Sequence, residues 1–316
     1  MAHEQHNIAF YNLENLFDTI DDPDTLDDDF TPKGKKRWNE RKYRKKLKKL
    51  GYVIARIGAD KIGKPPAIIG VAEVENKKVI RDLIGSKHLK DLGYRYVHFN
   101  APDERGIDTA LLYRDAYFEP VNSTTHTVLI ENFDGRRDYT RDILQVTGFL
   151  QGALVHILVN HWPSRRDGAD ITEYKRIATA KRNLEVVEQI LADDPTANIV
   201  VMGDLNDNPE STSVKGHLVI PELYNPMTEL LTYTRGSSTW NKQWFLFDQI
   251  IVSRSLLEDN NSGLKFEKAD IFDPPFIKEY SGRFKGNPFR TFAGTKHLGG
   301  FSDHFPVFAT LAIHKI

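Results

Sequence analysis

Short β-rich apolar runs recur along the chain and limit the folds that it can adopt. Each run is bounded by turn-forming residues, a pattern typical of strands in a layered sheet protein. The predicted strands cover residues 7–11, 67–74, 95–99, 107–113, 154–160, 198–203, 248–253 and 305–311. Because these strands mix with only a few helices, we expect an α+β sandwich in which helices pack outside sheets.

Two amphipathic helices are predicted between the strands. In the first, over residues 43–57, apolar residues form one stripe at helical spacing and Lys and Arg fill the other faces. The second starts near Asp170, with Glu173 three residues on in a capping-box pattern. There is no internal repeat and no linker rich in Pro, Ser or Gly, so we expect residues 1–316 to form one domain.

The composition excludes several kinds of site. The chain has no cysteine, which excludes disulfides, thiolate metal sites and a Cys nucleophile. The formal net charge of -1 gives no whole-protein attraction for nucleic acid, so any affinity for phosphate must be local. No stretch approaches the roughly 18 apolar residues of a membrane span. The chain as written predicts a cytoplasmic protein, or a periplasmic or secreted one if a leader was removed.

Charge is uneven near the start of the chain. Residues 18–29 carry seven Asp, whereas residues 33–49 carry eleven Lys or Arg against one acid, Glu40. One interpretation is that both are solvated faces that partly neutralise each other, and the other is that Lys45, Lys46 and Lys49 track phosphates. The stretch DDPDTLDDD lacks the glycine and glutamate of an EF-hand calcium loop.

Polar or ionisable side chains stand at the ends of several predicted strands. In VVMGDLNDNP a β-branched run breaks into a loop that begins with Asp204 and Asn206. Asp and Asn are ordinary turn formers, so this stretch alone does not separate a turn from a site. The same pattern recurs at Asn12 and Glu14, Glu73 and Glu75, His161, Asp248, and Asp303 and His304. Together these residues predict one site at one rim of a sheet.

These motifs also carry a family resemblance. The motifs NLEN, VAEVEN, NHWPSR, GDLND and SDHFPV, in this order, resemble the endonuclease/exonuclease/phosphatase superfamily over residues 7–311, and more locally a bacterial branch of it. DNase I-like nucleases, neutral sphingomyelinases and inositol polyphosphate 5-phosphatases belong to that superfamily. The resemblance implies a four-layered α/β sandwich, with two mixed β-sheets face to face and helices outside. It places the active site at one end of the sandwich.

The resemblance implies a metal site as well. Glu73 is the expected main ligand, Asn12 and Asp303 complete or support its coordination, and Glu14 joins them. Hard oxygen ligands without thiolates suit Mg²⁺, with Mn²⁺ as the alternative. Many family members have Gln before the metal-binding Glu, whereas this chain has Ala72. The chain therefore lacks an amide that helps to orient the ligand.

The remaining roles concern the hydrolysis itself. Asp204 is expected to orient and deprotonate the attacking water, and Asn206 to hold water or a phosphate oxygen in line. The imidazoles of His304 and His161 are expected to donate to phosphate oxygens. An imidazole in this role needs a partner, and the candidates are Asp248 for His304 and Asp108 for His161. Arg165 is either a phosphate clamp or a surface residue paired with Asp167.

Three functions follow as hypotheses. The first is a metal-dependent phosphoesterase that acts on a phosphodiester such as DNA or RNA, and the second is a phosphatase for a small phosphorylated molecule, sugar or lipid headgroup. The third is a catalytically inactive binding module, although the chain retains every expected catalytic residue. A calcineurin-like phosphoesterase is disfavoured because the downstream Gly-Asn-His motif is missing. We expect a monomer whose partner is a phosphorylated substrate, with nucleic acid included.

Overall fold

Two six-stranded mixed sheets form the centre of the protein, and a computed structural model describes residues 4–257 and 263–313. The order in the first sheet is β15 (Leu264–Ile271), β18 (Val307–Ile313), β1 (Glu4–Leu16), β2 (Ile68–Val74), β4 (Asp108–Arg114) and β3 (Tyr94–His98). The order in the second sheet is β11 (Leu223–Tyr224), β14 (Asp248–Ser253), β10 (Ile199–Asp204), β9 (Ala153–His161), β8 (Ile143–Leu150) and β5 (Phe118–His126).

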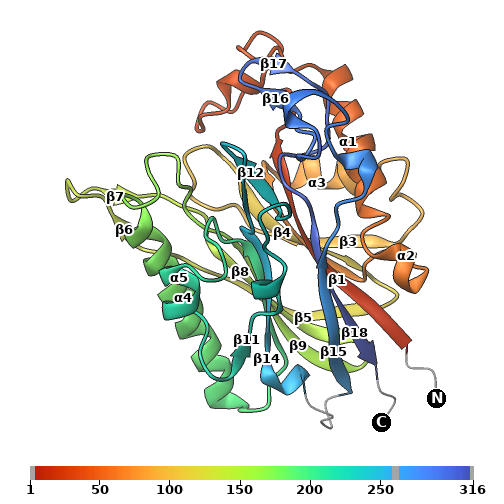
Figure 1. The fold of residues 1–316 in the computed structure, drawn as a ribbon, viewed down its shortest axis with the longest axis vertical. Coiled ribbons are helices and arrows are strands. Elements are labelled where there is room, and N and C mark those ends of the chain that lie inside the picture. Colours follow the sequence, from red (N-terminus) through yellow and green to blue (C-terminus); the bar gives the residue numbers. More distant parts are fainter. Residues whose placement is uncertain (1–3, 258–262, 314–316) are drawn as a thin grey trace.

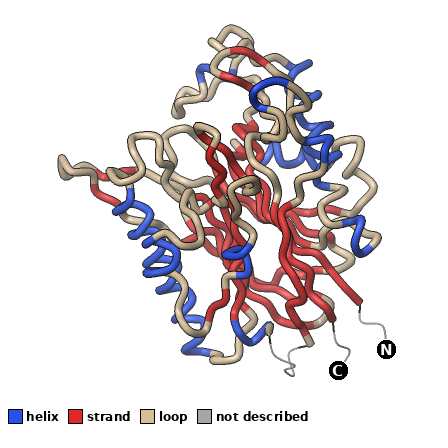
Figure 2. Tube along the Cα trace, in the orientation of Figure 1, coloured by secondary structure: helices blue, strands red, loops and turns tan. Residues whose placement is uncertain are grey.

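Helices cover the outer faces of both sheets (Figures 1 and 2). On the side of the first sheet lie α1 (Glu40–Ile54), α2 (Ala59–Ile62) and α3 (Lys77–Ile84), and on the side of the second lie α4 (Glu173–Asp193) and α5 (Thr212–His217). Short hairpins are β6–β7 (Ile130–Glu131, Arg137–Asp138), β12–β13 (Ser238–Trp240, Gln243–Phe245) and β16–β17 (Phe292–Ala293, Lys296–His297). The 3-10 turns are η1 (Asp28–Phe30), η2 (Pro226–Glu229), η3 (Arg254–Leu256), η4 (Pro275–Ile277) and η5 (Gly282–Phe284). The predicted four-layered sandwich is confirmed.

All eight predicted strands and both predicted helices are present, with ends shifted by a few residues. Strands β5, β8, β11 and β15, the three hairpins and helices α2, α3 and α5 were not predicted. β5 and β15 are edge strands with the sequences FEPVNSTTH and LKFEKADI. One face of each meets solvent and carries polar or charged residues, so neither forms the apolar run by which the other strands were predicted. The predicted capping box is wrong, since α4 begins at Glu173 after Thr172 with no side-chain cap. No helix within residues 4–257 and 263–313 is long and apolar enough to cross a membrane.

Alternation along the strands divides the core into two parts. In β10, Val200 and Met202 belong to the core between the sheets, whereas Ile199 and Val201 pack in the second core with residues of α4. The two sheets approach closely at Gly70 of β2, where a Cβ atom would lie 2.7 Å from the Met202 sulfur. A side chain there would push the sheets apart, so glycine is required by packing.

The same alternation aims the catalytic candidates into the space between the sheets. Successive side chains on a strand point to opposite faces, so Asp204 continues the inward row of Val200 and Met202. His161 follows Ile157 and Val159 in the same way. Parallel strands β9 and β10 pair His161 with Asp204, and antiparallel β14 pairs Asp248 with Asp204. Three ionisable side chains thus meet at the end of the second sheet.

Candidate active site

Asn12 connects the two sheets at this end. It lies in β1 of the first sheet and is fully buried. Its Nδ2 donates to Asp204 Oδ2 at 3.0 Å and to Glu73 Oε1 at 3.3 Å, while its Oδ1 accepts from the Glu14 N–H at 2.9 Å. The amide therefore holds one carboxylate from each sheet in a fixed relation.

Asp204 is buried and hydrogen-bonded on both oxygens. Its Oδ1 accepts from the backbone N–H of Asn206 at 2.9 Å, and this bond closes a tight turn in which Asn206 has a φ of 49°. Burial raises the pKa of Asp204 to about 6, with His304 acting in the opposite direction. An aspartate with a raised pKa is a stronger base than an ordinary one, as deprotonation of a water requires.

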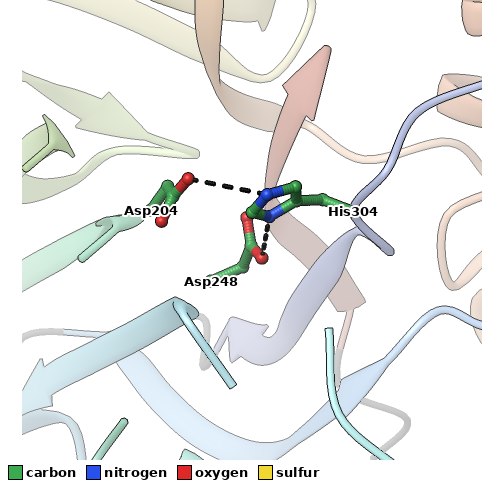
Figure 3. A group of neighbouring side chains, drawn as sticks. All are labelled: Asp204, Asp248 and His304. Carbon is green, nitrogen blue, oxygen red and sulfur yellow. Dashed lines mark hydrogen bonds and ion pairs between the residues drawn. The ribbon is translucent and has the colours of Figure 1, made fainter. Parts of the chain in front are cut away.

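His304 lies against two carboxylates, Asp248 and Asp204 (Figure 3). Its Nδ1 is 2.6 Å from Asp248 Oδ2, and its Nε2 is 3.8 Å from Asp204 Oδ2. Burial alone would lower the pKa of His304, but Asp248 and Asp204 together raise it well above the usual value. The ring is therefore a cation at neutral pH, and the expected pairing of His304 with Asp248 is present.

His161 is held in the opposite state. Its Nε2 lies 3.8 Å from both Glu73 Oε1 and Asp204 Oδ2. Burial, together with the nearby cations of Arg141 and Arg105, lowers the pKa of His161 well below the usual value, so the ring is neutral. A neutral imidazole can still donate one hydrogen bond to a phosphate oxygen, as expected of His161, but it brings no positive charge to the site.

Asp108 does not pair with His161, and this prediction needs correction. One Asp108 oxygen lies 2.8 Å from His98 Nε2 and the other accepts from the Ala101 N–H at 2.8 Å. Asp108 starts β4 in the first sheet, whereas His161 ends β9 in the second. The two residues therefore belong to different sheets, and Asp108 is bonded within its own. The Nδ1 of His161 is buried and has no partner among the described residues.

The Glu73 carboxylate is almost buried but has no Lys or Arg partner among the described residues. Its side chain is 14% exposed, and its Oε2 accepts from the Asn15 N–H at 2.7 Å. Within the part of the chain that the structure describes, no Lys or Arg lies within 4 Å of the Glu73 or Asp204 carboxylates. Two such oxygen donors without a Lys or Arg partner fit a divalent cation with a preference for hard ligands. The Asn12 side chain and the Asn15 backbone N–H both donate to Glu73 and orient its carboxylate. They supply the hydrogen bonding that Ala72, which has no side-chain amide, cannot.

The other expected metal ligands are engaged elsewhere. The Glu14 carboxylate accepts from the Thr291 and Phe292 N–H groups at 2.6 and 3.3 Å, so both of its oxygens hold the backbone at residues 291 and 292. Burial, with the Asp303 carboxylate nearby, raises the pKa of Glu14 to about 7. Asp303 Oδ2 accepts from Arg290 Nη2 at 2.6 Å. Backbone N–H groups thus hold Glu14 and an arginine holds Asp303, whereas Glu73 has neither a Lys nor an Arg within 4 Å among the described residues.

A second set of side chains also meets the distance requirement for a metal ion. One ligand atom each from Asp204, Asp248 and His304 lie within 4.8 Å of one another. These three residues can hold a metal, although the identity of such a metal does not follow from distances. A protonated His304 ring has no lone pair for a metal, so its raised pKa favours the hydrogen-bonded arrangement over direct coordination.

Arg165 follows the His161 turn, but it is not paired with Asp167. Its Nε donates to the Asn206 carbonyl at 2.7 Å and its Nη2 to Asp207. The buried Asp207 also accepts from Arg176 Nε of α4 at 2.7 Å. Arg165 thus supports the turn that carries Asn206, together with Asp207 and Arg176, two residues that the sequence analysis did not identify. The sequence signal for Asp207 was its place as the second Asp of the GDLND motif.

Replacing Asp207 by Asn should lower the free energy of unfolding by about 3 kcal/mol, because a buried arginine then loses its counter-ion. The matched control is Asp138→Asn, which removes the partly exposed partner of Lys175 near the start of the same helix and should cost about 1 kcal/mol or less. Urea unfolding of both variants measures the difference. Equal losses would show that Asp207 has no special part in the fold.

Comparisons with known proteins agree with this geometry. The model of the Endonuclease/Exonuclease/phosphatase family matches residues 7–313. No curated protein matches the chain. Three solved structures with TM-scores of 0.57 to 0.59 share the fold.

The first is D. rerio TDP2 complexed with a single-strand DNA product, which is 14% identical over 97% of this chain and 98% of that chain. The human Nocturnin catalytic domain with bound sulfate is 18% identical over 99% and 96%. A family protein from Bacteroides thetaiotaomicron is 15% identical over 100% of both chains. These likenesses confirm a DNase I-like fold, while the family match covers nearly the whole sequence. The chain therefore belongs to the endonuclease/exonuclease/phosphatase family and is a hydrolase of phosphate esters.

Proposed function

We propose that this protein is a divalent-metal-dependent phosphodiesterase that cleaves nucleic acid. The observation that supports the proposal is the position of Asp204 Oδ2, which lies 3.8 Å from the cationic ring of His304 and 3.8 Å from the neutral ring of His161. A base flanked by two hydrogen-bond donors is the arrangement that attack of water on an anionic phosphate requires.

Glu73 is the side chain that would hold Mg²⁺ or Mn²⁺, with Asn12 and Asp303 in supporting positions. A divalent cation there would neutralise charge on the phosphate and stabilise the departing oxygen. Asn12 presents its Nδ2 to Glu73 and keeps its Oδ1 on the Glu14 N–H, so a supporting role fits its geometry better than direct coordination.

The side chains of this chain then divide the proton transfers. Asp204 takes the proton of the attacking water at Oδ2, while the Asn206 N–H fixes its Oδ1. Asn206 Nδ2 donates to the Trp162 carbonyl at 3.0 Å, which leaves its Oδ1 to accept from the same water. His304 donates from Nε2 to a phosphate oxygen, and Asp248 stabilises the cation while it does so. Position accounts for much of the rate, because these groups need no rearrangement.

Nucleic acid is favoured over a small phosphorylated molecule by two observations. TDP2 from D. rerio has the same fold, and its structure holds a single-strand DNA product. Helix α1 also carries exposed basic residues, Arg41, Lys45 and Lys48, that have no acidic partner within ion-pair distance among the described residues. A phosphodiester in a polyanion suits both features.

Hydrolysis assays on EDTA-stripped protein test the proposal. With Mg²⁺ or Mn²⁺ restored, we expect cleavage of single-stranded DNA, plasmid DNA or RNA, and of the small diester bis-p-nitrophenyl phosphate. Glu73→Gln should raise the metal concentration for half-maximal activity at least tenfold, because it removes the charged ligand. Release of phosphate from small monoesters alone would indicate a phosphatase instead. No turnover of any substrate would favour the inactive binding module.

A further inference from the structure

Helix α1 carries two parallel rows of basic residues, and the inner row is already engaged. Lys46 is buried and donates to the Glu14 carbonyl and, at 2.8 Å, to Thr291 Oγ1. Lys49 donates to the Gly299 carbonyl, and Lys42 lies 5.8 Å from the centre of the Phe292 ring. The prediction that Lys46 and Lys49 track phosphates is therefore wrong, since both hold the segment around β16–β17 against the helix.

The outer row consists of Arg41, Lys45 and Lys48, called here the α1 basic row. All three side chains are exposed, and none has an acidic partner within ion-pair distance in the described residues. Spacings of four and three residues place them on one face of the helix, over a length of about 10 Å. Burial lowers the pKa of His297 and of His88, and nearby cations lower both pKa values further. Lys45 is one of the cations at His297 and Lys48 is one of those at His88, so both lysines add to a positive environment.

The row is connected to the active site through the segment that the inner row holds. This segment includes Arg290, whose guanidinium contacts Asp303, the neighbour of His304. Figure 1 shows α1 beside the β16–β17 hairpin, and β1, the strand that includes Asn12, runs toward this part of the molecule. Arg290 and Asp303 thus link the segment packed on α1 to His304, the proposed donor to the phosphate.

We propose that the α1 basic row binds the phosphate backbone of the nucleic acid substrate beside the scissile bond. The inference rests on the proposed function and adds where the flanking nucleotides lie. Charge complementarity supports it, because a row of like charges without counter-ions is relieved by a polyanion. An anionic membrane is a poorer fit, since the apolar side chains of α1, among them Tyr43, Leu47 and Leu50, are buried and none of its large apolar residues is exposed.

Charge reversal tests the row against a matched control. The test variant is Lys45→Glu with Lys48→Glu, and the control is Lys181→Glu on α4 with Lys268→Glu on β15, two exposed lysines that shift the net charge equally. Binding of a labelled 30-nucleotide single-stranded DNA is measured in the Asp204→Asn background, where cutting of the probe is expected to be about a thousandfold slower. The test variant should bind at least tenfold more weakly than the control. The slope of the logarithm of the binding constant against the logarithm of the salt concentration should become shallower by about 1.4, because two phosphate contacts are lost.

Two further measurements separate the possible failures. Hydrolysis of bis-p-nitrophenyl phosphate by otherwise unmodified enzyme should be equal in the test and control variants, because neither changes the catalytic residues. Equal DNA binding by test and control, while the wild type still cleaves DNA, would overturn the α1 assignment and leave the proposed function intact. If the test variant loses only binding to vesicles with 30% phosphatidylserine, the row is a membrane surface and the proposal is wrong. Failure of the wild type on every nucleic acid would instead refute the proposed substrate.

Discussion

Replacing Asp204 by Asn should lower kcat about a thousandfold while the protein stays folded. The amide has nearly the shape of the carboxylate and can still accept the Asn206 N–H bond on its oxygen. It cannot take a proton from water, and its NH₂ group would oppose Asn12 Nδ2, which now donates to Asp204 Oδ2. Steady-state kinetics on bis-p-nitrophenyl phosphate with saturating Mg²⁺ measure the loss.

The control for this variant is the melting temperature together with the far-ultraviolet circular dichroism spectrum. The buried carboxylate has a raised pKa because burial disfavours its charge, so neutralising it should not unfold the protein. A folded variant that keeps more than a tenth of the wild-type kcat would remove Asp204 from the role of base. Asp138→Asn, the surface variant used for stability, should keep full activity.

Much of the site was predictable because strand alternation and motif order act together. Val200 and Met202 face the space between the sheets, so Asp204 had to face it too, and the same argument applies to His161 after Ile157 and Val159. The parallel pairing of β9 with β10 then brings these two residues side by side. Hydrophobic periodicity over a few residues is local, and it can be interpreted from the sequence alone.

Other parts of the site depend on contacts between segments far apart in the chain, which periodicity does not encode. Glu14 follows a strand as the expected ligands do, yet its carboxylate binds N–H groups of residues 291 and 292. Lys46 belongs to a run that looks solvated, yet it is buried against Thr291. Arg165 is adjacent to a catalytic turn but is paired with Asp207 by the way α4 and that turn meet. In each case tertiary packing selected the partner.

Replacing His304 by Ala should lower kcat by about a thousandfold, because it removes the cation that Asp248 and Asp204 hold beside the phosphate. Asp248→Asn should cost less, about tenfold to a hundredfold, because an amide oxygen can still accept from His304 Nδ1 but no longer stabilises the charge on the ring. Kinetics on bis-p-nitrophenyl phosphate and on single-stranded DNA measure both losses.

The kinetic parameter that these two variants change distinguishes a cationic donor from a metal ligand. If His304, Asp248 and Asp204 held a metal together, both variants should raise the Mg²⁺ concentration for half-maximal activity, as Glu73→Gln is expected to do. If His304 acts as a cation fixed by Asp248, both variants should lower kcat at saturating metal and leave that concentration unchanged. A raised metal requirement in Asp248→Asn would therefore move the metal from Glu73 to the end of the second sheet.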